Sequence, residues 1–123
     1  MAGQDLNKRY RAFAIGVALL IQQLPKNAIN YAYCNQLIRA SSSPGANYRA
    51  ACRAKSNKDF LNKLKIVEEE LDESIFFLDL LKHFNSKWDE SFDKQLKEAN
   101  ELLSITVASI RSARAKIKTN KPH

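Results

Sequence analysis

The sequence has 123 residues, of which 45% are hydrophobic, three are glycine and three are proline. A chain of this length can bury a core without metals or disulfides, and we expect it to form one domain over residues 1–123. The low content of Gly and Pro excludes a disordered protein and a turn-rich β protein. The net charge of +7 adds the expectation of either a polyanionic partner or extensive pairing with acidic surfaces.

The first predicted helix covers residues 5–24. Its apolar side chains recur at helical spacing, and Asp5 suits the positive end of a helix. Pro25 ends it, because a residue that precedes proline is displaced from the α region. The longest unbroken apolar run, residues 12–21, holds ten residues. A bilayer span needs roughly 20, so we expect no membrane partner.

The second predicted helix covers residues 28–55, and either Asn27 or Asn30 can cap it. Its pattern is interrupted by the segment SSSPG, which contains Pro44. In one interpretation a loop separates two short helices at this point. In the other, one helix continues with a kink near Pro44, since proline removes a backbone donor and clashes with the preceding turn. We favour the kinked helix, because alanines resume the helical character at once.

The third predicted helix covers residues 57–84 and the fourth covers residues 87–118. Ser56 followed by Asp59 is a helix start signal, and Asn85 can close the third helix just before Ser86 opens the fourth. Both helices carry apolar residues in an alternating four-three rhythm, which in the third comprises Phe60, Leu64, Val67, Leu71, Leu78 and Leu81. Four such helices with short links predict an all-α, antiparallel up-down-up-down four-helix bundle.

Charge is distributed unevenly along this chain. Residues 1–65 carry 11 Lys/Arg and 2 Asp/Glu, residues 66–101 carry 4 and 11, and residues 102–123 carry 5 and none. Two interpretations are open. Either basic and acidic surfaces pair within a chain or between subunits, or the basic segments form a surface that binds a polyanion.

The two cysteines, Cys34 and Cys52, form no CxxC pair and no Cys/His ligand cluster. We interpret them as small, reduced, packed side chains of a cytoplasmic protein, and the alternative is a disulfide or a reactive thiol. The N-terminal segment shows no signal-peptide cleavage site, which agrees with a cytoplasmic location.

Residues 36–73 read QLIRASSSPGANYRAACRAKSNKDFLNKLKIVEEELDE. A QLIRA helix runs into a serine-proline element, a basic turn, an S-x-x-D-F start and an acidic E-L-D-E segment. This block resembles the central block of the bacterial four-helix-bundle proteins encoded in intervening sequences of 23S rRNA genes. The matching positions are Gln36, Arg39, Ala40, Ser43, Pro44, Asn47, Arg53, Ser56, Phe60, Leu64, Glu70, Leu71 and Glu73.

The sequence departs from the commonest form of that block at one step. Where many members have I-P-x-N-I-A-E-G, it has S-P-G-A-N-Y-R-A-A, so Arg49-Ala50-Ala51 replaces an acidic-glycine step. The resemblance implies a homo-oligomer, typically a pentameric ring, without established enzymatic activity. Related accessory proteins of diversity-generating retroelements share the bundle and the ring, and they work beside a reverse transcriptase and nucleic acid. The resemblance therefore suggests association with RNA or DNA.

The basic residues form the candidate nucleic-acid-binding site. Lysine and arginine hold phosphates by charge, and the guanidinium group adds bidentate hydrogen bonds. In the alternative, the same residues pair with the carboxylates of residues 68–73 in this chain or in a neighbouring subunit. The predicted site residues are Arg39, Arg49, Arg53, Lys55, Lys58, Lys63, Arg111 and Arg114.

Motifs for catalysis or cofactor binding are not apparent. The sequence shows no nucleophile–base pair, Gly-rich phosphate loop or nucleotide fingerprint, and neither His83 nor His123 has the acid three residues earlier that metal-binding bundles use. We therefore expect no enzyme, no catalytic residue, no metal and no cofactor. Two functions remain: a homo-oligomeric bundle that binds RNA or DNA, or a protein-interaction scaffold or accessory subunit without direct nucleic-acid contact.

Overall fold

The fold was described from a computed structural model that defines the backbone of residues 2–119 and the side chains of residues 5–119. Four helices account for most of this part of the chain: α1 (Ala2–Gln23), α2 (Ala28–Cys52), α3 (Asn57–Phe84) and α4 (Asp89–Thr119). A single 3-10 turn, η1 (Ser86–Trp88), precedes α4. No strand occurs within residues 2–119, so the predicted all-α fold class is confirmed.

The helix ends differ from the predicted ones by a few residues. α2 ends at Cys52 rather than at residue 55, because the backbone N–H of Arg53 bonds back to Ala50 and Ala51 and closes the helix. Arg53 and Lys55 therefore lie in the connection to α3. α1 covers residues 2–23 instead of 5–24. α4 begins at Asp89 instead of residue 87, because residues 86–88 form the tighter 3-10 turn.

Side-chain caps define the starts of α2 and α3. The side chain of Asn27 accepts a hydrogen bond from the Asn30 N–H at 2.9 Å, and the Ser56 hydroxyl accepts one from the Asp59 N–H at 3.0 Å. Each cap satisfies one of the N–H groups that the first turn of a helix leaves without a partner. Asn27, and not Asn30, is thus the cap of α2.

α2 is one continuous helix that contains Pro44, which excludes the interpretation with two short helices and a loop. The serines before the proline make local bonds to backbone carbonyls: Ser42 Oγ donates to the Ile38 carbonyl at 2.8 Å. The carbonyl that Pro44 leaves without its regular donor is that of Ala40, whereas the hydroxyls of Ser41 and Ser42 bond to the carbonyls of Ile38 and Arg39. Pro44 itself is buried. The size of the bend at this residue stays a prediction.

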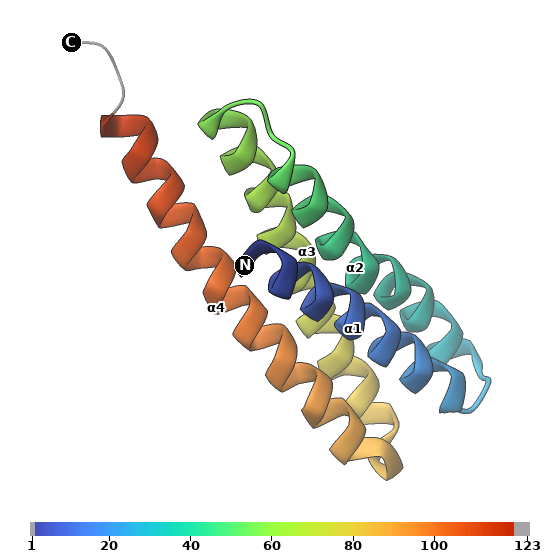
Figure 1. The fold of residues 1–123 in the computed structure, drawn as a ribbon. Helices are drawn as coiled ribbons and strands as arrows, with labels where there is room; N and C mark the ends of the chain where they lie inside the picture. The colour runs from blue at the N-terminus through green and yellow to red at the C-terminus, as the bar shows by residue number, and fades with distance from the viewer. Residues whose placement is uncertain (1, 120–123) are drawn as a thin grey trace.

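The helices pack in a ring in which each contacts two others (Figure 1). Each helix runs in the opposite direction from the one before it, and the diagonal pairs α1–α3 and α2–α4 make no backbone contact within residues 2–119. α1 has 22 residues and α4 has 31, and the N-terminus of α1 lies about halfway along α4 (Figure 1). One end of the bundle therefore consists of α2, α3 and α4 without α1.

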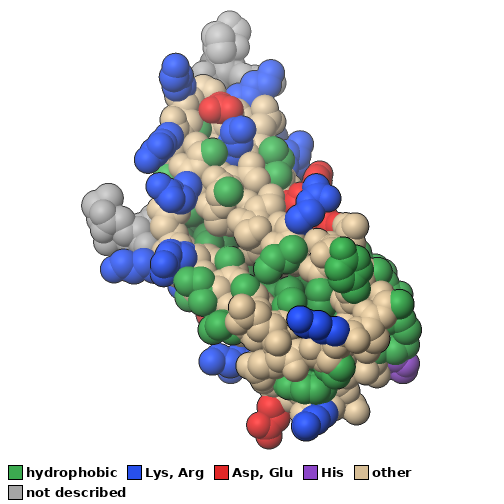
Figure 2. Space-filling view, turned by 90° about the vertical axis from the view of Figure 1, so that its right-hand side faces the viewer, with side chains coloured by type: hydrophobic (Ala, Val, Ile, Leu, Met, Phe, Trp, Pro, Cys, Tyr) green, Lys and Arg blue, Asp and Glu red, His purple; other side chains and the backbone are tan. Residues whose placement is uncertain are grey.

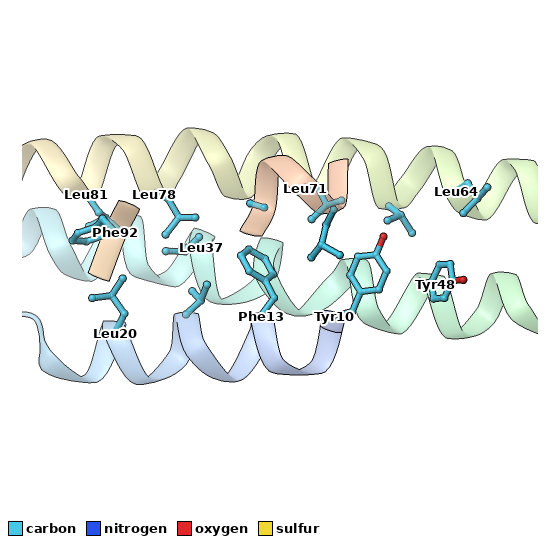
Figure 3. Close-up of a cluster of buried hydrophobic side chains, with 14 of the residues drawn as sticks. Tyr10, Phe13, Leu20, Leu37, Tyr48, Leu64, Leu71, Leu78, Leu81 and Phe92 are labelled. Carbon is cyan, nitrogen blue, oxygen red and sulfur yellow. The ribbon is translucent and has the colours of Figure 1, made fainter. Parts of the chain in front are cut away.

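The core runs along the bundle axis (Figure 3). The rhythm predicted for α3 is confirmed, because Leu64, Val67, Leu71, Leu78 and Leu81 are at most 1% exposed. Phe60, the first residue of that rhythm, is only partly buried and packs against the edge of the core. Burying these apolar side chains supplies most of the driving force for folding.

Two polar contacts are buried within this core. The hydroxyls of Tyr10 and Thr106 lie 2.9 Å apart, and Tyr10 is the donor because the Thr106 hydroxyl donates to the Leu102 carbonyl. Asn30 and Asn85 exchange two amide hydrogen bonds of 2.9 and 2.8 Å. Buried polar groups are tolerated when they are paired in this way, and the second pair ties the start of α2 to the end of α3.

Candidate nucleic-acid interface

The antiparallel packing brings most of the predicted basic residues to one end of the bundle. The last turn of α2, the connection after it, the start of α3 and the C-terminal part of α4 meet at the end of the bundle where α1 reaches no farther than Arg49 (Figure 1). We call this part of the molecule the basic end. Its Lys and Arg residues are Arg49, Arg53, Lys55, Lys58, Lys63, Lys65, Arg111, Arg114, Lys116 and Lys118.

The basic end holds ten Lys/Arg and a single acidic residue, Asp59, within residues 49–65 and 108–119. Nine of the ten basic side chains are exposed and Lys63 is half-buried. Figure 2 shows Lys and Arg dominating the charged surface in the upper part of the molecule, whereas hydrophobic side chains gather in its lower part. Charges of one sign at this density produce a positive potential that attracts polyanions.

None of these ten residues forms an ion pair within 4.0 Å among the described side chains. The ion pairs of residues 5–119 lie elsewhere: Arg9 pairs with Glu98 at 2.6 Å and with Glu101 at 3.2 Å, and Lys82 pairs with Asp93 at 2.7 Å. Among the described residues, no carboxylate of the same chain therefore forms an ion pair with the basic cluster. Pairing between subunits stays a prediction.

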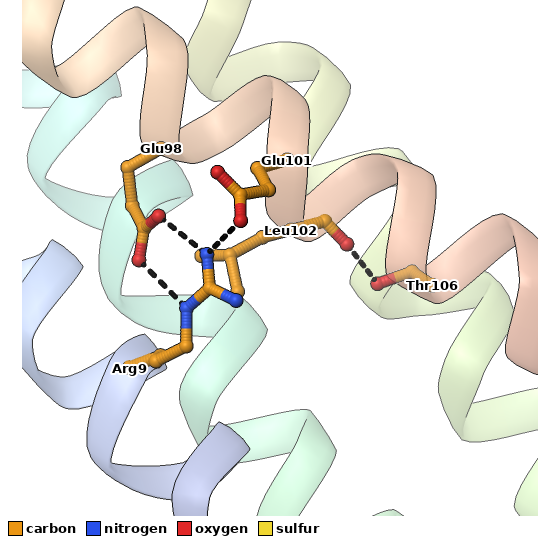
Figure 4. A network of polar contacts seen from close by, with 5 residues as sticks. All are labelled: Arg9, Glu98, Glu101, Leu102 and Thr106. Atoms are coloured by element: carbon orange, nitrogen blue, oxygen red, sulfur yellow. Dashed lines mark hydrogen bonds and ion pairs between the residues drawn. The ribbon is translucent and has the colours of Figure 1, made fainter.

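Arg9 forms ion pairs with two carboxylates of α4, those of Glu98 and Glu101 (Figure 4). Its guanidinium donates to both oxygens of Glu98, through Nε at 3.1 Å and Nη2 at 2.6 Å. The hydrogen bond with Glu98 is the largest cause that raises the pKa of Arg9 above its ordinary value, and partial burial opposes it. This bidentate pair fastens α1 to α4 at the level where α1 begins.

Arg39 lies apart from the other predicted residues. It lines a small polar groove of about 140 Å³ between α2 and α3, together with Gln36, Ser43, Glu70 and Glu73. Burial is the main cause that raises the pKa of Glu70, Glu73 raises it further, and Arg39 lowers it. The neighbourhood of Arg39 is therefore acidic, which is a poor setting for a phosphate.

Lys8 and Arg11 on α1 are basic residues that the sequence reasoning did not include. They line a groove of about 480 Å³ between α1 and α2, and Arg49 closes the same groove from α2. Their spacing of three residues places them on one face of α1, which is the signal that could have identified them. The groove extends the positive surface from the basic end onto α1.

The remaining features give no sign of a reaction centre. No group of three or more His, Cys, Asp or Glu side chains is placed to bind a metal ion within the part of the chain that the structure describes, which excludes His123. Cys34 is half-buried and Cys52 is exposed, so the expectation that both thiols are packed is wrong for Cys52 at the end of α2. Both are free thiols. None of the described helices is long and apolar enough to cross a membrane.

The sequence matches the family model of the 23S rRNA-intervening sequence protein over residues 4–108. The chain belongs to this family. Its fold is similar to that of a crystal structure from Bacteroides thetaiotaomicron, a protein of unknown function from the S23 ribosomal protein family, with a TM-score of 0.81 and 26% sequence identity. That similarity covers 90% of this chain and 99% of the other. No curated protein matches the sequence.

The family match confirms the resemblance that residues 36–73 indicate, and it extends over most of α1 and α4 as well. Neither the family description nor the description of the solved structure names an activity, so the function proposed for this chain rests on the geometry of the basic end.

Proposed function

We propose that this chain is a non-enzymatic, homo-oligomeric bundle that binds RNA or DNA through the basic end. The observation that supports it is the set of ten Lys/Arg side chains, of which nine are exposed and none is paired with a carboxylate of the described chain. Phosphates would be held by charge and by guanidinium hydrogen bonds, and their binding would release counterions. Arg39 belongs to a different surface and has no part in this proposal.

Assembly of several subunits strengthens such a surface. Apolar side chains that are exposed in a single chain, such as Ile15 (42%) and Leu19 (54%) on α1, favour contacts between copies. A ring, which we propose to have five subunits, would repeat the basic end around an axis. Repeated weak contacts to one polyanion then gain through effective concentration.

Fluorescence anisotropy with a structured RNA and a duplex DNA tests the proposal. The variant with Arg53→Glu, Lys58→Glu and Arg111→Glu should bind about 100-fold more weakly at low salt, because several phosphate contacts become repulsive. Its dependence of affinity on salt should also be shallower, by about 0.9 in the logarithmic slope for each lost contact with a duplex.

The matched control reverses three lysines elsewhere on the surface, as Lys26→Glu, Lys94→Glu and Lys97→Glu. These residues are exposed and lie near the other end of the bundle, so the net charge changes equally while the basic end stays intact. The control should retain most of the affinity. Equal losses in both variants, or no salt-sensitive binding by the wild-type chain at micromolar concentration, would contradict the proposal.

A second candidate function, a protein-interaction scaffold, is favoured by the aromatic cluster of α2 and α3. Tyr33 lies 6.1 Å from Phe77 and 6.2 Å from Phe84 between ring centres, and Phe84 is 49% exposed. If the assembled protein does not bind nucleic acid but does bind a partner protein through this cluster, the scaffold function is favoured.

A further inference from the structure

A groove with an aromatic wall lies within the basic end. It has a volume of about 440 Å³ and runs between the start of α3 and the C-terminal part of α4. No residue of α1 with a described side chain, residues 5–23, lines it. The backbone of α1 begins about halfway along α4 (Figure 1), and the residues that line the groove belong to α3 and α4.

The lining combines three kinds of chemistry. Phe60 supplies an aromatic ring that packs partly against the core and is thereby held in place. Asn57, Ser109 and Ser112 supply an amide and two hydroxyls, which can donate and accept hydrogen bonds. Lys116 supplies a positive charge at the same groove.

We infer that this groove takes an unpaired nucleobase of a single-stranded RNA or DNA segment. The inference rests on the proposed function and specifies the class of nucleic acid. A base presents a π-face that stacks on an aromatic side chain, and polar edges that pair with amides and hydroxyls. The volume lies within the usual range for small-ligand sites, which is about 300–1,000 Å³.

The positive charge of the basic end indicates which ligand the groove binds. Lys116 lines the groove, and further exposed lysines and arginines lie on the same two helices, so a negatively charged chain with flat, largely apolar groups to insert suits it. Single-stranded nucleic acid has this combination. The bases of a duplex are stacked and paired inside the helix, and the base must leave the stack before it can reach Phe60.

The test compares wild type with Phe60→Leu, which keeps an apolar side chain but removes the ring. The probes are a labelled oligouridylate of about 12 nucleotides, which fits the site sizes of about 4–16 nucleotides known for single strands, an abasic strand of the same length, and a duplex. Phe60→Leu should weaken binding of the oligouridylate about tenfold, since one stacking contact is lost. Its affinities for the abasic strand and the duplex should not change.

Phe76→Leu is the matched control, because Phe76 lies on the same helix, is 58% exposed and is remote from the groove. It should leave all three affinities unchanged. Photochemical cross-linking of 5-iodouridine in the same strand should attach the base to the peptide that contains Phe60.

Three outcomes would overturn the inference. If Phe60→Leu binds the oligouridylate as well as wild type does, while binding stays salt-sensitive, the groove takes no base and only the proposed function survives. If Phe60→Leu changes the sedimentation coefficient of the protein but leaves its affinities for all three probes unchanged, the groove belongs to a subunit contact. If wild type binds none of the probes at low salt, the proposed function fails and this inference fails with it.

Discussion

The two ends of the bundle are built from the same helices and differ in almost every physical respect. At the end that contains the link between α1 and α2, all four helices are present, and Asn30 and Asn85 are 3% and 5% exposed and bonded to each other. At the basic end α2, α3 and α4 are present, one groove is open, and the ten Lys and Arg side chains have no ion-pair partner among the described residues. We call the first the closed end.

We expect the two ends to contribute differently to the stability of the bundle. Like charges held close together repel, and an open groove forfeits packing contacts, so the basic end contributes less to stability than the closed end does. Regions of low local stability are commonly those that bind ligands. Packing at the closed end and in the middle of the bundle supplies most of the expected stability, and it offsets the repulsion between like charges at the basic end.

The largest contrast is expected between the losses of stability when two phenylalanines are replaced by alanine. Phe92, near the closed end, is fully buried, whereas Phe60, at the basic end, is partly buried. Phe92→Ala should lower the free energy of unfolding by about 3–5 kcal/mol, since it leaves a cavity in a packed core. Phe60→Ala should lower it by roughly 1–2 kcal/mol, because less apolar area is lost. Urea denaturation monitored by circular dichroism measures both. Equal losses would contradict the difference between the ends.

Removing the buried amide pair should have the next largest effect. The Asn85 side chain accepts one hydrogen bond from Asn30 and donates two, to Asn30 and to the Leu81 carbonyl. Asn85→Ala leaves the Asn30 amide buried without this partner, and should lower the free energy of unfolding by about 2–3 kcal/mol.

The exposed Asn62 serves as the control for this substitution, and Asn62→Ala should change stability by less than about 0.5 kcal/mol. The double variant Asn30→Ala with Asn85→Ala should be less destabilised than the sum of the single variants, because neither then leaves a bare partner. Additive losses would show that the two amides are not coupled.

Single lysines should give the smallest effects, with opposite signs at the two ends. Lys82, near the closed end, pairs with Asp93 at 2.7 Å, while Lys116 has only positive neighbours along the end of α4. Lys82→Gln should lower Tm and Lys116→Gln should raise it, each by less than about 2 °C at low salt. High salt should erase both differences, since it screens exposed charges. A shift of the same sign in both variants would argue against repulsion at the basic end.

The helices were predictable because their signals are local. The apolar rhythm of α3, the cap at Ser56 and the stop at Pro25 each depend on residues within a few turns, and the structure places α3 over the predicted residues 57–84. The end of α2 was predicted less well. There, alanines of high helix propensity continue to residue 54, and the tight turn to the Ser56 cap decides the boundary instead.

The candidate site was predictable only in part. Seven of the eight predicted residues come together at the basic end, and these are Arg49, Arg53, Lys55, Lys58, Lys63, Arg111 and Arg114. Arg39 was grouped with these residues by proximity in sequence, but ten residues of α2, about 15 Å, separate it from Arg49. Lys8 and Arg11 were missed because α1 reaches Arg49 only through packing.

The sequence by itself determined four amphipathic helices and their order, because hydrophobic periodicity depends only on the residues of each segment. Only the tertiary structure decided that Asn30 meets Asn85 and that Arg9 engages the carboxylates of α4. The reason is that the register and rotation of each helix are set by how four faces fit together. No single helix contains that information.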